Sequence, residues 1–138
     1  MPTVRLATLD DASELFALTR DFSTSFVVER MAFDRSLAAL ALDPNAHLAV
    51  AEDGVLVGYV LGFDHYALFA SGRVSWVEEI IVQEGRRRQN VGRQLMDSFE
   101  AWCRARGSRM VALATRRAAG FYEAIGYERS AEYFRKLL

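Results

Sequence analysis

The sequence predicts one mixed α/β domain with a largely antiparallel sheet, and three observations support this fold class. Its 138 residues match the length of a single domain, and no internal repeat or Pro/Ser-rich linker divides them. The Asp53-Gly54 pair between two apolar stretches is a strong β-hairpin signal. The amphipathic stretch from Val91 to Cys103 has an apolar strand on either side, which indicates a right-handed β-α-β crossover over residues 75–115.

The N-terminal half predicts a strand, two helices and three strands. Residues 4–7 alternate enough for a short strand. Asp10 and Asp11 can cap a helix with apolar positions through Phe22, and Asp34 can cap a second helix that ends before Asp43-Pro44. Strands are expected at 47–52 and 55–63 around the hairpin turn, and at 73–82.

The C-terminal half predicts two helices and three shorter strands. The helix that begins near Asn90 repeats apolar residues at helical spacing and stops at Gly107. A buried strand over 110–114 and a helix over 118–125 follow. A final strand pair is expected at 127–129 and 132–137. The expected domain therefore covers residues 1–138, with a mixed central sheet of about six to seven strands and about four helices.

Composition excludes several classes of protein. One cysteine rules out an internal disulfide, and with only two histidines the chain has too few ligands for a Cys/His zinc site, so no metal is expected. No apolar run approaches the ~18–20 residues of a membrane span, and the N-terminus lacks a signal-peptide core. We expect a cytoplasmic protein.

Charge is divided sharply along the chain. Residues 1–85 contain 5 Arg and 13 Asp/Glu, whereas residues 86–117 contain 9 Arg and 2 acids. The acidic half would favour a cationic partner, and the basic window an anionic one.

The basic window includes the loop Arg86-Arg87-Arg88-Gln89-Asn90-Val91-Gly92-Arg93, which joins an apolar strand to the long helix. A helix N-terminus offers unpaired N–H groups and a partial positive charge. Nearby arginines would add attraction for an anion. The residues alone allow two interpretations, a phosphate or pyrophosphate cradle and a solvated basic loop.

The loop Arg87-Arg88-Gln89-Asn90-Val91-Gly92 resembles the acetyl-CoA pyrophosphate loop of the GNAT superfamily of N-acetyltransferases. A second signature of that family is similar to the segment Phe121–Tyr127, and the opening residues 4–8 and the order of elements also agree. The resemblance therefore covers the whole chain and implies a GNAT-like fold. Asn90 departs from the family pattern, which has glycine there, although Asn tolerates a left-handed backbone.

The resemblance implies acetyl-CoA as cosubstrate and assigns its contacts. The pyrophosphate would meet the loop and the first turn of the helix. The backbone of Ile81 and Val82 would pair with the pantetheine amides. Expected cofactor-binding residues are Ile81, Val82, Arg87, Arg88, Gln89, Asn90, Val91, Gly92 and Arg93. The 3′-phosphate partner stays open among Arg86, Arg87, Arg116 and Arg117.

Tyr122 is the expected general acid. Acyl transfer from a thioester expels a thiolate, and a phenol near the sulfur can protonate it. In the family the Phe-Tyr signature often gives a tyrosine this role. The structural alternative is a helical aromatic side chain packed beside Phe121.

Glu78 and Glu79 are the expected sources of a general base. They lie in an apolar strand, where a carboxylate is unlikely to be buried without a partner. Strand alternation predicts that one faces each way. A carboxylate with a raised pKa could accept the proton of the attacking amine, and Glu78 is slightly preferred.

The expected function is transfer of an acetyl group from acetyl-CoA to a primary amine, small-molecule or peptide, by direct attack in a ternary complex. A non-catalytic acyl-CoA-binding domain is the alternative. Nucleic-acid binding is disfavoured, because the net charge of -1 is not basic and Phe99 and Trp102 fall on the core face of the helix. A homodimer is left open.

Overall fold

The computed structural model describes residues 1–23, 25–86 and 90–138. The elements in chain order are β1 (Thr3–Leu6), a 3₁₀ turn (Leu9–Asp11), α1 (Ala12–Phe22), α2 (Arg30–Leu42), β2 (Ala46–Asp53), β3 (Val55–Ala67), β4 (Gly72–Val82), α3 (Val91–Ala105), β5 (Val111–Ala112) and α4 (Ala119–Ala124). None of the described helices is long and apolar enough to cross a membrane.

The sheet has five strands in the order β1-β2-β3-β4-β5. The first four pair antiparallel, and β5 pairs parallel with β4 at Ser75↔Val111 and Trp76↔Ala112. The expected hairpin turns at Asp53-Gly54, with Gly54 at φ 75°. The mixed α/β class, the largely antiparallel sheet and the β4-α3-β5 crossover are confirmed.

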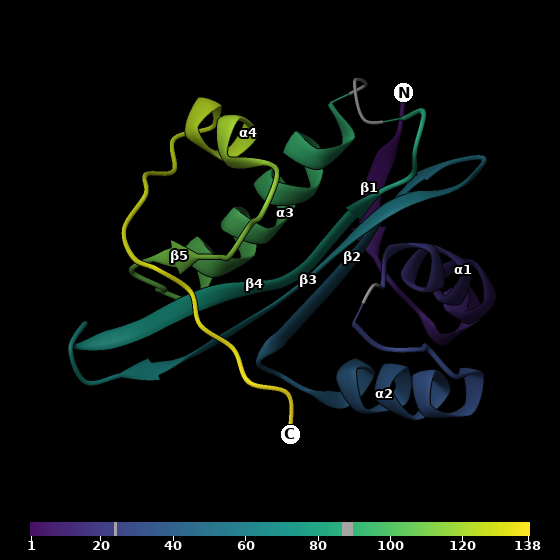
Figure 1. Cartoon of the computed structure of the whole chain (residues 1–138), viewed down its shortest axis with the longest axis horizontal. Coiled ribbons are helices and arrows are strands. Elements are labelled where there is room, and N and C mark those ends of the chain that lie inside the picture. Colours follow the sequence, from purple (N-terminus) through teal and green to yellow (C-terminus); the bar gives the residue numbers. More distant parts are fainter. Residues whose placement is uncertain (24, 87–89) are drawn as a thin grey trace.

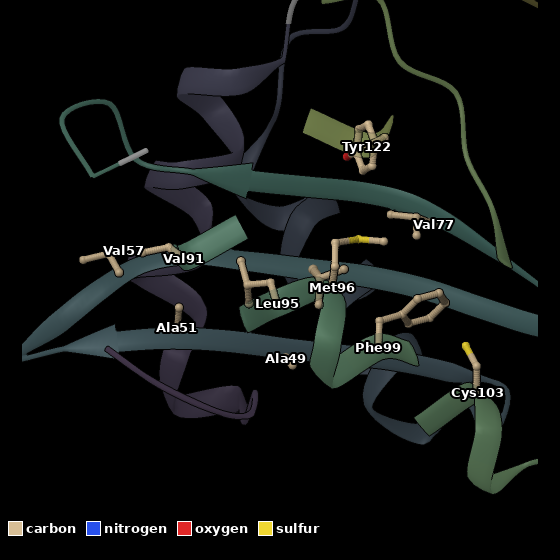
Figure 2. Packing of buried hydrophobic residues seen from close by; sticks show 11 residues of the cluster. Ala49, Ala51, Val57, Val77, Val91, Leu95, Met96, Phe99, Cys103 and Tyr122 are labelled. Atoms are coloured by element: carbon tan, nitrogen blue, oxygen red, sulfur yellow. The ribbon is translucent and has the colours of Figure 1, made fainter. Parts of the chain in front are cut away.

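The helices cover both faces of the sheet, with α1 and α2 on one side and α3 on the other (Figure 1). Two buried clusters result. The α3-side core includes the expected apolar stripe of α3, namely Val91, Leu95, Met96, Phe99 and Cys103 (Figure 2). The α1/α2-side core contains Leu15, Leu18, Leu37, Val50, Leu56, Tyr59 and Ile81. Strand alternation separates these sets, because neighbouring residues of a strand point to opposite faces.

A β-bulge interrupts β4 at Glu78. The register pairs Leu61 with Glu79 and Gly62 with Val77, so Glu78 is the extra residue. Val77 and Ile80 both pack in the α3-side core. The expectation that Glu78 and Glu79 face opposite ways assumes a regular strand and is therefore wrong. In the bulge the two glutamates together take the place of one residue, on the face opposite to Val77 and Ile80.

The second helix begins four residues earlier than expected. The side chain of Glu29 accepts hydrogen bonds from the backbone N–H groups of Met31 and Ala32 at 3.0 and 3.1 Å, and it thereby caps α2. Asp34, the expected cap, instead pairs with Arg30 one turn away at 2.9 Å.

The expected final strands at 127–129 and 132–137 do not form, so the sheet has five strands rather than six to seven. An added strand needs a run of neighbouring backbone groups, and β5 offers only two residues. The segment 127–138 is mostly exposed and crosses the sheet as an irregular chain (Figure 1). Tyr133 stacks on Trp76, with ring centroids 6.2 Å apart, and Arg135 donates a hydrogen bond to Ser25 at 2.8 Å.

Candidate active site

The N-terminus of α3 has the backbone geometry of an anion site. Asn90 adopts the left-handed conformation, with φ 61° and ψ 15°, and is the N-cap residue. The N–H of Gln94 bonds to the Asn90 carbonyl at 3.0 Å, so the N–H groups of Val91, Gly92 and Arg93 precede the first intrahelical bond. Such groups at a helix N-terminus attract anions, and the helix dipole adds to the attraction.

The loop that leads to α3 is tied to the neighbouring hairpin. Arg86 forms an ion pair with Asp53 at 2.8 Å, and Asp53 is the last residue of β2. Arg86 is therefore engaged by a carboxylate. Arg87, Arg88 and Gln89, three of the expected cofactor-binding residues, lie outside the described residues.

Gly92 lies where α3 approaches the aromatic side chain that precedes Tyr122. A Cβ atom at this position would come within 3.3 Å of the Phe121 ring and 3.8 Å of Val82 Cγ2. The small residue therefore lets the first turn of α3 approach both α4 and β4 closely. Packing alone therefore favours glycine at position 92, apart from any contact with a ligand.

Among the residues that the structure describes, β4 has a neighbouring strand on only one side beyond Trp76. The described pairing with β5 ends at Trp76↔Ala112, while the pairing with β3 continues to Val82. The N–H of Gln83 donates to the Val57 carbonyl at 2.8 Å. Because hydrogen-bonded pairs recur at every second residue of an antiparallel ladder, Ile81 directs its backbone groups to β3. Ile80 directs its own to the opposite edge.

Glu79 lies on the α1/α2 side of the sheet, against a small cavity. The cavity has a volume of about 90 Å³ and is lined by residues of α1, α2, β2, β3 and β4. Tyr59 donates a hydrogen bond to Glu79 Oε1 at 2.8 Å. Burial raises the pKa of the Glu79 carboxyl; the hydrogen bond from Tyr59 opposes that rise and the charge of Glu78 adds to it. A half-buried carboxylate with a raised pKa can act as a general base.

Glu78 is exposed at the bulge. The two glutamates therefore differ in environment: Glu78, the slightly preferred candidate, is exposed, whereas Glu79 is half-buried, accepts a hydrogen bond from Tyr59 and has a raised pKa.

Tyr122 is buried, with 7% of its surface exposed, and lies in the α3-side core with Val77 and Met96 (Figure 2). Its ring packs edge-on against Phe121 and Tyr127, at centroid distances of 5.0 and 5.8 Å. Burial raises the pKa of its hydroxyl. Within the described residues that hydroxyl has no hydrogen-bond partner, and it is not among the polar atoms sealed from solvent. It can therefore donate a proton to a ligand atom.

The structure adds two side chains that the sequence pattern did not reveal. Tyr59 on β3 and Thr19 on α1 join Glu79 in a chain of hydroxyls, with 2.9 Å between the two hydroxyl oxygens. Thr19 falls in the first expected helix and Tyr59 in the strand expected at 55–63. Contacts across 20 and 40 residues leave no signal in a single sequence.

Comparison with known proteins gives concordant results. The acetyltransferase (GNAT) family model matches residues 12–127. An aminoalkylphosphonate N-acetyltransferase of Salmonella typhimurium (strain LT2) is 30% identical over 140 residues, covering 98% of this chain and 90% of the relative.

Solved structures share the fold across the whole chain. A protein of Bacillus halodurans C-125 described as a transcriptional regulator has a TM-score of 0.90 at 22% identity, with 100% of both chains covered. Glucosamine-6-phosphate N-acetyltransferase of Arabidopsis thaliana has a TM-score of 0.89 at 16% identity, covering 99% of this chain and 98% of the other.

Proposed function

The chain belongs to the acetyltransferase (GNAT) family and is an N-acetyltransferase, and from this premise we propose that it transfers the acetyl group of acetyl-CoA to a primary amine by direct attack in a ternary complex. The observation that supports this proposal best is the position of Glu79. Its carboxylate has a raised pKa and belongs to β4, the strand whose described pairing with β5 ends at Trp76.

The cosubstrate would lie along that edge, with its pyrophosphate at the N-terminus of α3. The N–H groups of Val91, Gly92 and Arg93 would hold the pyrophosphate, together with the loop residues Arg87, Arg88, Gln89 and Asn90. One pantetheine contact is proposed at Ile80 instead of Ile81, since the backbone of Ile81 is turned to β3. Val82 keeps its proposed role.

In the chemical step, Glu79 would accept a proton from the amine as the nitrogen attacks the thioester carbonyl. The N–C bond forms and the C–S bond breaks. Tyr122 would give its hydroxyl proton to the departing sulfur and be reprotonated from solvent. Because burial favours the neutral forms of both side chains, Tyr122 would keep its proton near neutral pH and Glu79 would bind one more readily than an exposed carboxylate.

The acceptor is proposed to be a small primary amine, with aminoalkylphosphonates as the first candidates. This choice follows from the printed activity of the 30% identical relative. A peptide amine is the second class to test, since the acidic N-terminal half of the sequence would attract any cation.

The test is thiol release from acetyl-CoA with a panel of an aminoalkylphosphonate, a simple alkylamine and a lysine peptide. We expect turnover with at least one amine, and a loss of about 10²–10⁴-fold in kcat for Glu79→Gln, the usual contribution of a positioned base. Glu128→Gln, at an exposed position, serves as the control and should keep the parental rate.

A thermal-shift titration with acetyl-CoA separates binding from turnover. Acetyl-CoA at 100 times its Kd should stabilise the chain by about 2.7 kcal/mol. Stabilisation without thiol release from any amine would contradict the enzymatic proposal and favour an acyl-CoA-binding domain. Full activity of Glu79→Gln would contradict only the role of Glu79 as the base and would leave the enzymatic proposal standing.

A further inference from the structure

Three hydroxyl and carboxyl groups form an unbroken chain on the α1/α2 side of the sheet. Thr19 Oγ1 lies 2.8 Å from the Leu15 carbonyl oxygen and 2.9 Å from the Tyr59 hydroxyl, which lies 2.8 Å from Glu79 Oε1. Thr19, Tyr59 and Glu79 all border the cavity between the helices and the sheet. The chain thus joins α1, β3 and β4, and it begins at a backbone carbonyl and ends at a carboxylate.

The protons in this chain can be arranged in two ways. When Glu79 is ionised, Tyr59 donates to it, and Thr19, which is within reach of both the Leu15 carbonyl and the Tyr59 oxygen, can give its one proton to Tyr59 in place of Leu15. When Glu79 is protonated, it donates to Tyr59, Tyr59 donates to Thr19, and Thr19 donates to the Leu15 carbonyl. Every hydroxyl has a partner in both arrangements, because each hydroxyl is a donor and an acceptor and a carbonyl can accept a second bond.

We propose that Tyr59, supported by Thr19, is a positioning residue that holds Glu79 and satisfies it in both of its charge states during the acetyl-transfer cycle. The proposal rests on the base role given to Glu79 above. Tyr59 holds Oε1, whereas Oε2 has no partner among the described residues and is not sealed from solvent. Oε2 is thereby left to accept the proton of the amine. Once Glu79 is protonated, the hydrogen bonds of the chain reverse their direction.

Among the described residues, few other charged groups lie near enough to Glu79 to pair with it or to shift its pKa. Tyr59 is the only other titratable side chain among the described residues that line the cavity, and α1 and α2 contribute no charged group to it. Within the described part of the chain, the neighbouring charge that affects Glu79 is that of Glu78 on the same strand. The hydrogen bond from Tyr59 favours the ionised carboxylate, because bonds to a charged acceptor are the stronger ones.

The decisive variant is Tyr59→Phe, which keeps the ring and removes the hydroxyl. We expect the acid limb of its kcat/KM profile to move to higher pH, with a loss of about tenfold on that limb, the effect of one hydrogen bond to a charged group. A carbon-13 NMR titration of the Glu79 carboxyl should show the same upward move of the midpoint without any substrate. Thr19→Val should shift both in the same direction by less.

Tyr127→Phe is the matched control. Tyr127 donates a hydrogen bond to Glu100 at 2.7 Å, so this variant also loses a tyrosine–glutamate bond, but outside the cavity. Its Glu79 midpoint should stay at the parental pH. An unshifted Glu79 midpoint in folded Tyr59→Phe overturns the proposal, and Thr19→Val decides the matter if Tyr59→Phe fails to fold. Full activity of Glu79→Gln overturns the base role instead, whatever the titration shows.

Discussion

At the scale of single residues, Tyr122 gives the sharpest test of the chemistry. If its hydroxyl protonates the departing sulfur, Tyr122→Phe should lower kcat by about 10²–10⁴-fold, as for a positioned general acid. The acetyl-CoA Kd should stay nearly unchanged, because the helix terminus and the β4 edge are intact. Steady-state kinetics and calorimetry measure the two quantities.

A melting curve, taken together with kcat and the acetyl-CoA Kd, distinguishes the alternative roles of Tyr122. The hydroxyl has no hydrogen-bond partner among the described residues, so its removal should change the melting temperature little. A lower melting temperature with an intact kcat would make Tyr122 a core residue only. Weaker binding with an intact kcat would make it a ligand contact.

Substitutions at Asn90 test whether the loop needs a left-handed backbone at this position. Its φ of 61° is a conformation that glycine adopts at little cost and that other residues resist. Asn90→Gly should therefore leave acetyl-CoA affinity unchanged or improve it, as measured by calorimetry. Asn90→Ala, which keeps a Cβ but loses the amide, is the control. A large loss of affinity in both variants would make the amide side chain itself a ligand contact.

At the scale of elements, a buried ion cluster joins the ends of four segments. The Asp64 carboxylate on β3, whose side chain is 0% exposed, pairs with Arg73 of β4 at 2.8 Å and with Arg106 after α3 at 2.6 Å. Both arginines also donate to the Asn45 side chain, just before β2. Burial disfavours the charge of Asp64, but the two arginines outweigh it and lower its pKa to about 2.

Asp64→Asn should destabilise the chain by about 3 kcal/mol, because it leaves two guanidinium groups without their shared carboxylate. Urea unfolding at neutral pH measures the loss. The pKa of Asp64 falls from a usual value of 3.8 to about 2 on folding, so its contribution is present above pH 3.8 and is lost as the pH falls toward 2. The gap between parent and variant should close in that range. Asp34→Asn, which breaks an exposed pair with Arg30, should cost less than about 1 kcal/mol; an equal loss would contradict the role of burial.

At the scale of the whole molecule, local patterns predicted most of the architecture. The 3.6-residue period of α3, the Asp53-Gly54 turn and the order of the elements as far as α4 are properties of neighbouring residues, and all three are confirmed. The family resemblance is confirmed as well. The left-handed Asn90 (φ 61°) agrees with the expectation that Asn tolerates this backbone where the family pattern has glycine.

What the sequence could not predict depends on partners distant along the chain. The C-terminal strands failed because β5 is too short to pair with them. The earlier start of α2 is a local exception, because the Glu29 side chain caps the N–H groups two and three residues ahead, and glutamate is not among the preferred capping residues. The bulge at Glu78 is set by register against β3, and the contact of Glu79 with Tyr59 follows from it. Local periodicity contains no information on such pairings.

The bulge at Glu78 means that β4 can lose one residue without disturbing the core. Val77 and Ile80 both pack in the α3-side core with two residues between them. Loss of residue 78 would leave the single intervening residue of a regular strand, so both side chains would still face that core. Glu79 would keep Leu61 as its register partner, so its carboxylate would stay on the α1/α2 side. A regular strand does not tolerate such a loss, because a one-residue shift there turns every later side chain to the other face.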